Sequence, residues 1–249
     1  MKILVCISNV PDTTTKIKFT PDNKKLDPTG VQWIINPWDE LALTRALELK
    51  ESSNGLIQKV NVINVGQKDT ELTIRKALSM GADEAFRIDA IPYETYYVAY
   101  QVAHFLKNNP YDLVITGLES SDFNGNGFGQ MLATLSNYNL LTAISGIDLK
   151  ENKLIFYRDF DDERQTIEAK FPLVVVIQKG IAKEPKIPSM RGIMAARTKP
   201  INVIQPQNIQ PLVEFIEFQL PPPKGKCKFI DPENFNEVIR ILHEEIKII

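Results

Sequence analysis

Strand and helix patterns alternate along the first 140 residues, and this alternation restricts the possible folds more than any other feature of the chain. Short apolar runs typical of buried strands are each followed by a segment whose apolar residues have helical spacing. Strands separated by helices of about 10–15 residues form crossover units, which build a parallel sheet with helices on both faces. The sequence therefore predicts an α/β fold with an open parallel sheet. The predicted strands are residues 3–7, 60–65, 85–88 and 113–116, and the predicted helices span residues 70–80, 96–107 and 130–135.

A further helix is predicted to start directly after Asn36. Asn36 suits the N-cap position, and Pro37 suits the first helical position, where its missing N–H costs no hydrogen bond. Before this helix, residues 16–19 and 31–35 flank a turn-rich segment, and they are predicted to pair as a hairpin.

The sequence changes character after residue 140. Ten of the sixteen prolines lie between Pro172 and Pro232, a density that prevents long helices and favours an extended arm. We expect an α/β domain over residues 1–205 and, over residues 206–249, a proline-rich arm that ends in a helix. The apolar stripe of that helix must fold back or bind a partner, and it consists of Phe235, Val238, Ile239, Leu242 and Ile246. Shorter strands, some of them antiparallel, are predicted at residues 144–149, 153–158, 165–170 and 173–177.

Composition and charge exclude several classes of protein. A chain with 43% hydrophobic and 24% charged residues has the composition of a globular protein, and its net charge of -2 argues against binding to nucleic acid or to an anionic membrane surface. No apolar run approaches the roughly 20 residues that span a bilayer. The two cysteines form no metal-binding pair, and Met1-Lys2 leads straight into a short strand without a signal peptide. We therefore expect a cytoplasmic protein, or a matrix protein if it comes from an organelle.

A glycine loop is the most informative local feature. In open parallel sheets, ligands bind beyond the carboxyl ends of the strands, which places residues 6–10, 65–66 and 117–128 on one rim. Gly125, Gly127 and Gly129 alternate there just before a helix, and glycines allow backbone N–H groups to approach a phosphate. The loop matches neither the dinucleotide fingerprint nor a P-loop, so a plain turn remains an equal alternative.

The sequence offers no clear catalytic group. Carboxylates at Asp159, Asp161, Asp162 and Glu163 have the residue type for acid–base chemistry, but a solvated hairpin tip is the favoured interpretation. His104 and His243 have no acidic or cysteine partner at metal-ligand spacing, and no nucleophile motif is present. The residues alone thus indicate a nucleotide-binding module without its own substrate chemistry.

Six motifs then occur in the order and at the spacing of one known family. The chain resembles the β subunit of electron transfer flavoprotein over essentially its whole length, although Val176 stands where the family usually has a small or hydroxyl residue. The motifs are Met-Lys-Ile-Leu-Val-Cys-Ile at 1–7, Asn-Pro-Trp-Asp-Glu at 36–40, Thr-Ile-Arg-Lys-Ala-Leu-Ser-Met-Gly-Ala-Asp at 73–83, the glycine-loop segment 117–131, Glu-Pro-Lys-Ile-Pro-Ser-Met-Arg-Gly-Ile-Met at 184–194 and Ala-Arg-Thr-Lys-Pro at 196–200.

This resemblance implies an electron-carrier subunit that is not itself an enzyme. It implies a sheet of the adenine-nucleotide-binding type, a structural AMP, and a heterodimer with an α subunit that holds most of a redox-active FAD and that the C-terminal arm wraps. Electrons would pass from acyl-CoA and related dehydrogenases, as in fatty acid oxidation, toward a quinone oxidoreductase. The AMP-binding positions that the resemblance implies are Cys6, Asn36, Pro37, Trp38, Asp39, Val65, Gly117, Leu118, Glu119, Ser120, Ser121, Asp122, Phe123, Asn124, Gly125, Asn126, Gly127 and Phe128.

The resemblance also implies a partner-docking loop within residues 183–199. Met190 takes the position of the family's usual anchoring leucine and keeps its volume and apolar character. Arg191 stands where proline or a small residue is common, which changes the expected shape of the loop. The positions of this loop are Ser189, Met190, Arg191, Gly192, Ile193 and Met194.

Three alternatives remain open at this point. The glycine loop departs from many relatives through Phe123 and Phe128, so a second FAD, as in bifurcating electron transfer flavoproteins, competes with AMP. A stand-alone adenine-nucleotide-binding stress-type protein would share the sheet but would lack the long arm. An adenylating enzyme would need a Ser-Gly-Gly-x-Asp-Ser loop where this chain has Ser-Asn-Val-Pro-Asp at 8–12, which makes it improbable.

Overall fold

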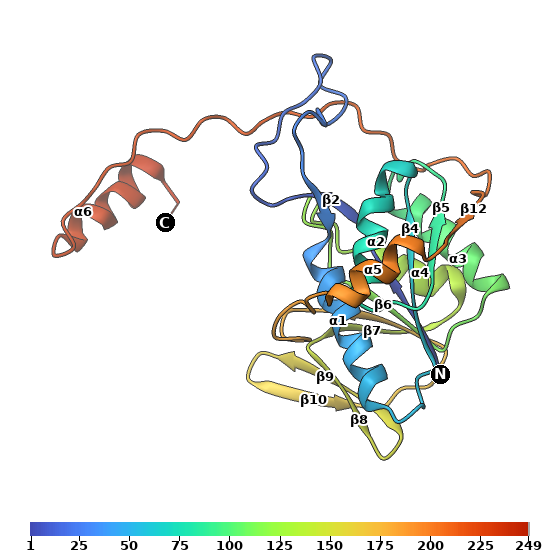
Figure 1. The fold of residues 1–249 in the computed structure, drawn as a ribbon. Coiled ribbons are helices and arrows are strands. Elements are labelled where there is room, and N and C mark those ends of the chain that lie inside the picture. The colour runs from blue at the N-terminus through green and yellow to red at the C-terminus, as the bar shows by residue number, and fades with distance from the viewer. Residues whose placement is uncertain (249) are drawn as a thin grey trace.

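The computed structural model describes residues 1–248 of the 249-residue chain and is built on a seven-stranded parallel sheet (Figure 1). The strand order is β12-β5-β4-β1-β6-β11-β7, with every neighbouring pair parallel. The predicted α/β class with an open parallel sheet is confirmed. The strands are β1 (Lys2–Cys6), β4 (Lys59–Val65), β5 (Ala85–Ile88), β6 (Leu113–Gly117), β7 (Asn139–Ile144), β11 (Leu173–Ile177) and β12 (Ile201–Ile204).

Helices cover both faces of this sheet because its central strands are apolar on both sides. In β1, Ile3 and Val5 pack on the face of α1 and α2, whereas Leu4 and Cys6 pack on the face of α3 and α4. One face carries α1 (Pro37–Ser52), η1 (Lys68–Thr70), α2 (Glu71–Met80) and α5 (Met190–Thr198), and the other carries α3 (Thr95–Asn108) and α4 (Phe128–Ser136).

The predicted hairpin exists with a different first strand. Antiparallel pairing joins β2 (Asn9–Pro11) to β3 (Trp33–Ile35), whereas residues 16–19 lie in an exposed loop with a single bridge from Phe19 to Leu26. The prediction for residues 16–19 was wrong because pairing follows burial: Val10 is 1% exposed in β2, while Ile17 is 42% exposed.

Strands are found at all four positions predicted after residue 140, and the first and the last of them differ from the prediction. The predicted strand 144–149 is interrupted at Ser145, where the chain passes from β7 of the main sheet into a three-stranded antiparallel sheet. Residues 173–177 form β11 and lie inside the main sheet between β6 and β7. The acidic run forms the exposed tip of the β9–β10 hairpin, as the favoured interpretation had it. The antiparallel sheet consists of β8 (Gly146–Lys150), β9 (Lys153–Phe160) and β10 (Glu163–Ile167).

The proline-rich region contains more regular structure than its composition predicts. The expected loop over residues 189–194 is the start of helix α5, because the Ser189 side chain accepts a hydrogen bond from the Gly192 N–H and caps the helix. The chain then adds β12 to the sheet edge before an irregular stretch from residue 205 to residue 234.

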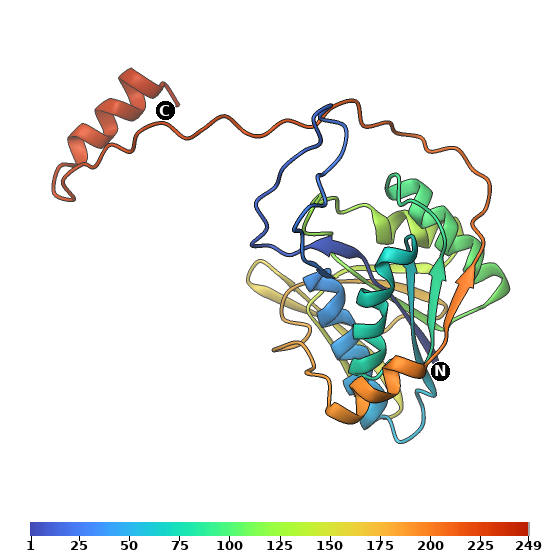
Figure 2. The same ribbon diagram turned by 45° about the horizontal axis from the view of Figure 1, so that its top comes forward.

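The arm passes over the loop that protrudes between β2 and β3 and carries its terminal helix away from the sheet (Figures 1 and 2). That helix comprises α6 (Phe235–Arg240) and a π-helical continuation, η2 (Ile241–Ile246). Its apolar stripe is uncovered, with Phe235 71% and Ile239 56% exposed. Within residues 1–248, no helix is long and apolar enough to cross a membrane.

Candidate ligand-binding site

A cavity of about 560 Å³ lies beyond the carboxyl ends of β1, β4 and β6. The three segments that the sheet argument placed on one rim all contribute to its wall. Of the eighteen predicted ligand positions, twelve line the cavity: Cys6, Asn36, Asp39, Val65, Gly117, Leu118, Glu119, Ser120, Asp122, Phe123, Gly125 and Phe128. The other six, which lie beside these residues in the chain without lining the cavity, are Pro37, Trp38, Ser121, Asn124, Asn126 and Gly127.

Asp39 connects two of the rim loops from beneath. Its Oδ2 accepts a hydrogen bond from the Ser8 N–H at 2.8 Å, and its Oδ1 accepts one from the Gly117 N–H at 3.0 Å. Burial in the first turn of α1 raises the pKa of Asp39 to about 7, because desolvation of the charged form outweighs these hydrogen bonds. The carboxyl group thereby fixes the ends of β1 and β6 relative to each other.

Asn36 occupies the predicted N-cap position of α1, but its side chain does not cap the helix. Its Nδ2 donates to the Glu119 carbonyl oxygen at 2.8 Å, and its Oδ1 accepts from the Ser121 N–H at 3.2 Å. A buried amide thus holds the start of the glycine loop by its backbone, so the loop geometry depends on a residue more than 80 positions away.

At Gly117 and Gly129, neighbouring atoms lie too close to leave room for a side chain, and the backbone angles play no part in the need for glycine. A Cβ atom on Gly117 would collide with Oδ1 of Asp39 and would lie 2.6 Å from Cβ of Trp38. A Cβ atom on Gly129 would collide with Cγ2 of Val176 and would lie 2.9 Å from Oγ1 of Thr116. The first turn of α4 therefore sits directly on β6 and β11, which brings its N-terminus to the cavity.

The N-terminus of α4 is left without a side-chain cap. Gly127 occupies the N-cap position and has no side chain to accept the free N–H groups of the first turn, and the Asn126 amide is hydrogen-bonded to Gln130 instead. Phe128, the first residue of α4, lines the cavity. Uncapped helix N–H groups favour a phosphate or another anion, because the helix dipole adds to their hydrogen bonds.

Side-chain charge in the cavity is entirely negative. Among residues 1–248, the cavity lining contains five carboxylates and neither lysine nor arginine. Several of these carboxylates already accept local N–H groups: Asp122 accepts from Phe123 at 2.9 Å, and Glu94 caps α3. A bound phosphate would therefore depend on backbone N–H groups rather than on ion pairs. The five carboxylates are Asp39, Asp69, Glu94, Glu119 and Asp122.

Two buried polar atoms at the cavity wall are unpaired within the described part of the chain. Oγ1 of Thr116 and Oδ1 of Asn64 have no hydrogen-bond partner there, although both residues line the cavity and are at most 3% exposed. The Asn64 amide is oriented by its Nδ2, which donates to the Ile7 carbonyl oxygen at 2.9 Å. Unpaired buried polar groups are rare in folded proteins, so this wall suits a polar ligand.

Several lining residues were not predicted. Gln67, Asp69 and Thr70 follow β4, and residues 92–95 follow β5, so the rule that ligands bind beyond strand ends, applied to longer loops, would have found them. Trp33 comes from the β2–β3 hairpin. Val213 and Phe215 come from the proline-rich arm, and no local signal in the sequence connects them with a cavity whose other lining residues all lie more than 80 positions earlier.

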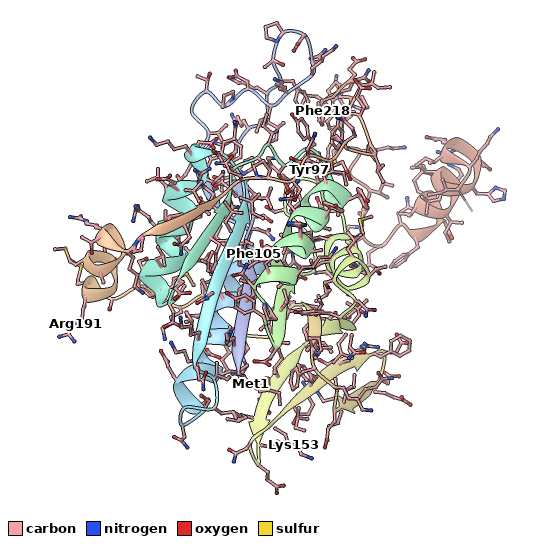
Figure 3. The ribbon with its side chains drawn as sticks, turned by 90° about the vertical axis from the view of Figure 1, so that its right-hand side faces the viewer. Met1, Tyr97, Phe105, Lys153, Arg191 and Phe218 are labelled. Carbon is pink, nitrogen blue, oxygen red and sulfur yellow. The ribbon has the colours of Figure 1, made fainter. Side chains whose placement is uncertain are left out.

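The predicted docking segment lies apart from this cavity, on helix α5. Met190 is 75% exposed and Met194 is 58% exposed, and Arg191 projects from the edge of the molecule (Figure 3). Arg75 holds the C-terminal end of this helix by donating from Nη1 to the Ala196 carbonyl oxygen at 2.7 Å. The structure thus presents exposed apolar side chains on a fixed helix and directly before it, which we name the α5 patch: Ile187, Met190, Ile193 and Met194.

In the described part of the chain, the cavity carries neither a metal-binding cluster nor a cysteine whose thiolate form is favoured. Within residues 1–248, no cluster of three or more histidine, cysteine, aspartate or glutamate residues is arranged to hold a metal ion. Cys6 is buried, and burial raises the pKa of its thiol well above the ordinary value, so the thiolate form is disfavoured. The cavity wall therefore offers groups that could contact a ligand, while the Cys6 thiol stays protonated.

Comparison with known proteins connects this geometry with one family. A family model described as "Electron transfer flavoprotein domain" matches residues 24–208. The chain is 30% identical to the electron transfer flavoprotein subunit beta of Bacillus subtilis over the full length of both chains. It is 31% identical to the human electron transfer flavoprotein subunit beta over 84% of this chain and 83% of the human protein. It is also 29% identical to the caffeyl-CoA reductase-Etf complex subunit CarD of Acetobacterium woodii over 99% of this chain and 98% of that protein.

Proposed function

Because this chain belongs to the family of electron transfer flavoprotein β subunits, we propose that it holds a structural AMP and, with an α subunit, encloses the FAD of an electron carrier. The FAD, held mainly by the α subunit, supplies the electron-accepting and electron-donating chemistry. This chain supplies a nucleotide site, a docking helix and an arm, and it performs no bond-making step of its own.

The AMP assignment is supported by one observation: the groups that the cavity offers to a phosphate are backbone N–H groups. The Asp39 and Asn36 hydrogen bonds fix the loops around it, and the uncapped N-terminus of α4 offers N–H groups for one phosphate. The absence of lysine and arginine among the described lining residues favours a ligand with a single phosphate over one with several. The unpaired Thr116 hydroxyl fits a polar ligand at the same wall.

The α5 patch supports docking of acyl-CoA and related dehydrogenases. Its methionines are exposed on a helix capped at Ser189 and held at its end by Arg75. Exposed methionine suits a surface that meets several partners, because its flexible thioether adapts to different pockets. Electrons would then leave toward a quinone oxidoreductase.

A second FAD in place of AMP is the competing assignment. It is kept because Phe123 and Phe128, at which the glycine loop departs from many relatives, both line the cavity. The stand-alone stress-type alternative is disfavoured, because the family match extends through the sheet and full-length relatives also cover the arm.

One experiment separates these assignments. The chain is co-expressed with the α subunit encoded in the same genome, the purified complex is denatured, and the released nucleotides are quantified by chromatography. One FAD and one AMP per heterodimer support the proposal. Two FAD and no AMP replace it with the second-flavin assignment, and a chain that purifies without any flavin-containing partner overturns both.

A further inference from the structure

Four phenylalanines from three distant segments meet beside the cavity, and two of them, Phe123 and Phe215, line it. Phe19 belongs to the loop between β2 and β3, Phe123 belongs to the glycine loop, and Phe215 and Phe218 belong to the arm. Figure 3 shows Phe218 at the loop end of the domain, the same end as Tyr97 in the first turn of α3. We name these four residues the phenylalanine latch.

Phe218 is the centre of the latch. Its ring stacks on Phe19 with centroids 5.4 Å apart and on Phe215 with centroids 5.5 Å apart, both at an interplanar angle of 23°. It also meets Phe123 edge-on at 6.4 Å. Phe123 and Phe215 contact each other at 5.3 Å, so the glycine loop and the arm are joined directly. Such pairs stabilise through ring geometry as well as through burial.

The arm is also tied to the domain by backbone hydrogen bonds at three points. The Gln101 side chain donates to the Gln207 carbonyl oxygen and accepts the Gln207 N–H, both at 2.8 Å. Further on, the Leu212 N–H donates to Oε1 of Glu94 at 3.3 Å. Finally, the Phe218 N–H donates to the Asn23 carbonyl oxygen at 2.8 Å. Residues 207–218 therefore run across the top of the domain as one tethered segment.

This tethered segment forms part of the cavity wall. Val213 and Phe215 of the arm line the cavity together with Phe123 of the glycine loop. We propose that residues 207–218 are a strap across the nucleotide cavity, closed by the phenylalanine latch, and that a bound nucleotide leaves only when the strap lifts. The proposal rests on the proposed function for the identity of the nucleotide.

The strap is built to open without unfolding the domain. Phe123 remains 58% exposed and Phe215 42% exposed, so the latch is a surface contact, whereas the apolar residues of the central strands β1 and β6 are buried. Segments with few buried contacts open locally at a lower free energy than the core does. The strap therefore controls how fast a nucleotide exchanges, independently of whether the domain is folded.

The test measures release of a labelled nucleotide from the intact heterodimer. The complex is loaded with radiolabelled AMP, an excess of unlabelled AMP is added, and retained label is followed by filtration. Phe218→Ala removes the centre of the latch, and we expect release at least ~10-fold faster than from the wild type. Phe160→Ala is the matched control, since Phe160 is a phenylalanine 60% exposed on the β9–β10 hairpin, outside both the arm and the latch; its release rate should equal that of the wild type.

A second variant shows whether any effect of Phe218→Ala comes from the latch or from misfolding of the arm. Phe19→Ala leaves the arm sequence intact and removes one stacking partner of Phe218, so it should accelerate release less than Phe218→Ala does. Equal release rates for the wild type, Phe218→Ala and Phe19→Ala would overturn the strap.

Hydrogen exchange of the arm separates failure of the strap from failure of the proposed function. If labelled AMP does not bind the wild-type complex, the AMP assignment is wrong, and the strap is judged by backbone amide exchange alone. Faster exchange over residues 207–218 in Phe218→Ala, but not in Phe160→Ala, would support the strap. Unchanged exchange would overturn it.

Discussion

Oδ1 of Asp39 accepts the Gly117 N–H at 3.0 Å in a space too small for any additional atom on Gly117. This contact joins the first turn of α1 to the carboxyl end of β6, at the point where the glycine loop begins. This part of the cavity wall therefore depends on the hydrogen bond between Asp39 and Gly117 and on the lack of a side chain at Gly117.

Gly117→Ala should reduce the free energy of unfolding by about 1–3 kcal/mol, because the new methyl group must displace Asp39 or Trp38. Urea denaturation measures this change. Gly225→Ala is the control, since a Cβ atom there meets nothing within 4 Å, and its stability should stay within about 0.5 kcal/mol of the wild type. A Gly117→Ala protein as stable as the control would contradict the geometry.

The contribution of Asp39 to stability should depend on pH in an unusual direction. Burial raises its pKa from 3.8 to about 7 in the folded protein, so between these values the folded state binds more protons than the unfolded state. Its contribution is therefore greatest at low pH, falls as pH rises from about 4 to about 7, and is constant above. Between pH 4 and pH 7, the contribution of Asp39 to the free energy of unfolding falls by at most about 4 kcal/mol.

Asp39→Asn removes that titration. It also leaves one of the two backbone donors facing an NH₂ group, which should cost about 1–3 kcal/mol. Urea unfolding of both proteins from pH 4.5 to pH 8 gives the difference in their stabilities. We expect the wild-type advantage to shrink as pH rises, and a difference independent of pH would show that Asp39 titrates normally.

Val176 and Gly129 should be energetically coupled. Gly129→Ala should destabilise the protein by about 1–3 kcal/mol, because its methyl group overlaps Cγ2 of Val176. Val176→Ala opens the space that this methyl group needs, so the double variant should be more stable than the sum of the single effects predicts. A double-mutant cycle from denaturation midpoints measures the coupling, and strict additivity would argue against the contact.

Met190→Asp tests the α5 patch. The side chain is 75% exposed, so the substitution should leave the melting temperature nearly unchanged, while the charge should raise the KM of a dehydrogenase for the complex at least ~10-fold. Reduction of the complex by an acyl-CoA dehydrogenase provides the measurement. Phe160→Asp, at a residue 60% exposed on the distant β9–β10 hairpin, should not change this KM. A similar KM for Met190→Asp and Phe160→Asp would show that the α5 patch does not contact the dehydrogenase.

The parallel sheet could be predicted because the sequence signals for its strands and helices lie within short segments. Continuous apolar runs and the Asn36-Pro37 helix start each follow from a few neighbouring residues. Helix α5 was missed because the prolines around it outweighed the Ser189 capping signal. The pairing partner of β3 was missed because residues 16–19 look like a strand locally, and only burial distinguishes them from β2.

The site was predictable wherever it lies at a strand end. The rule for parallel sheets placed residues 6–10 and 117–128 on the rim, and most of the predicted ligand positions line the cavity. The Asn36 side chain was assigned to the wrong contact, because an N-cap residue that bonds to a distant loop has the same local sequence as one that caps. Phe215 and Phe218 were missed because the arm reaches the cavity only through tertiary packing.

The all-acidic lining has a kinetic consequence for any anionic ligand. Positive potential normally attracts an anion over a Debye length, about 10 Å at 0.1 M salt, and so accelerates its arrival. Here the described carboxylates repel an approaching phosphate, although the backbone N–H groups hold it once it is inside. Association should therefore be slow and should become faster as salt is added, opposite to the usual behaviour of phosphate-binding proteins. The rate at which the nucleotide enters the cavity would then limit how fast a loaded subunit forms.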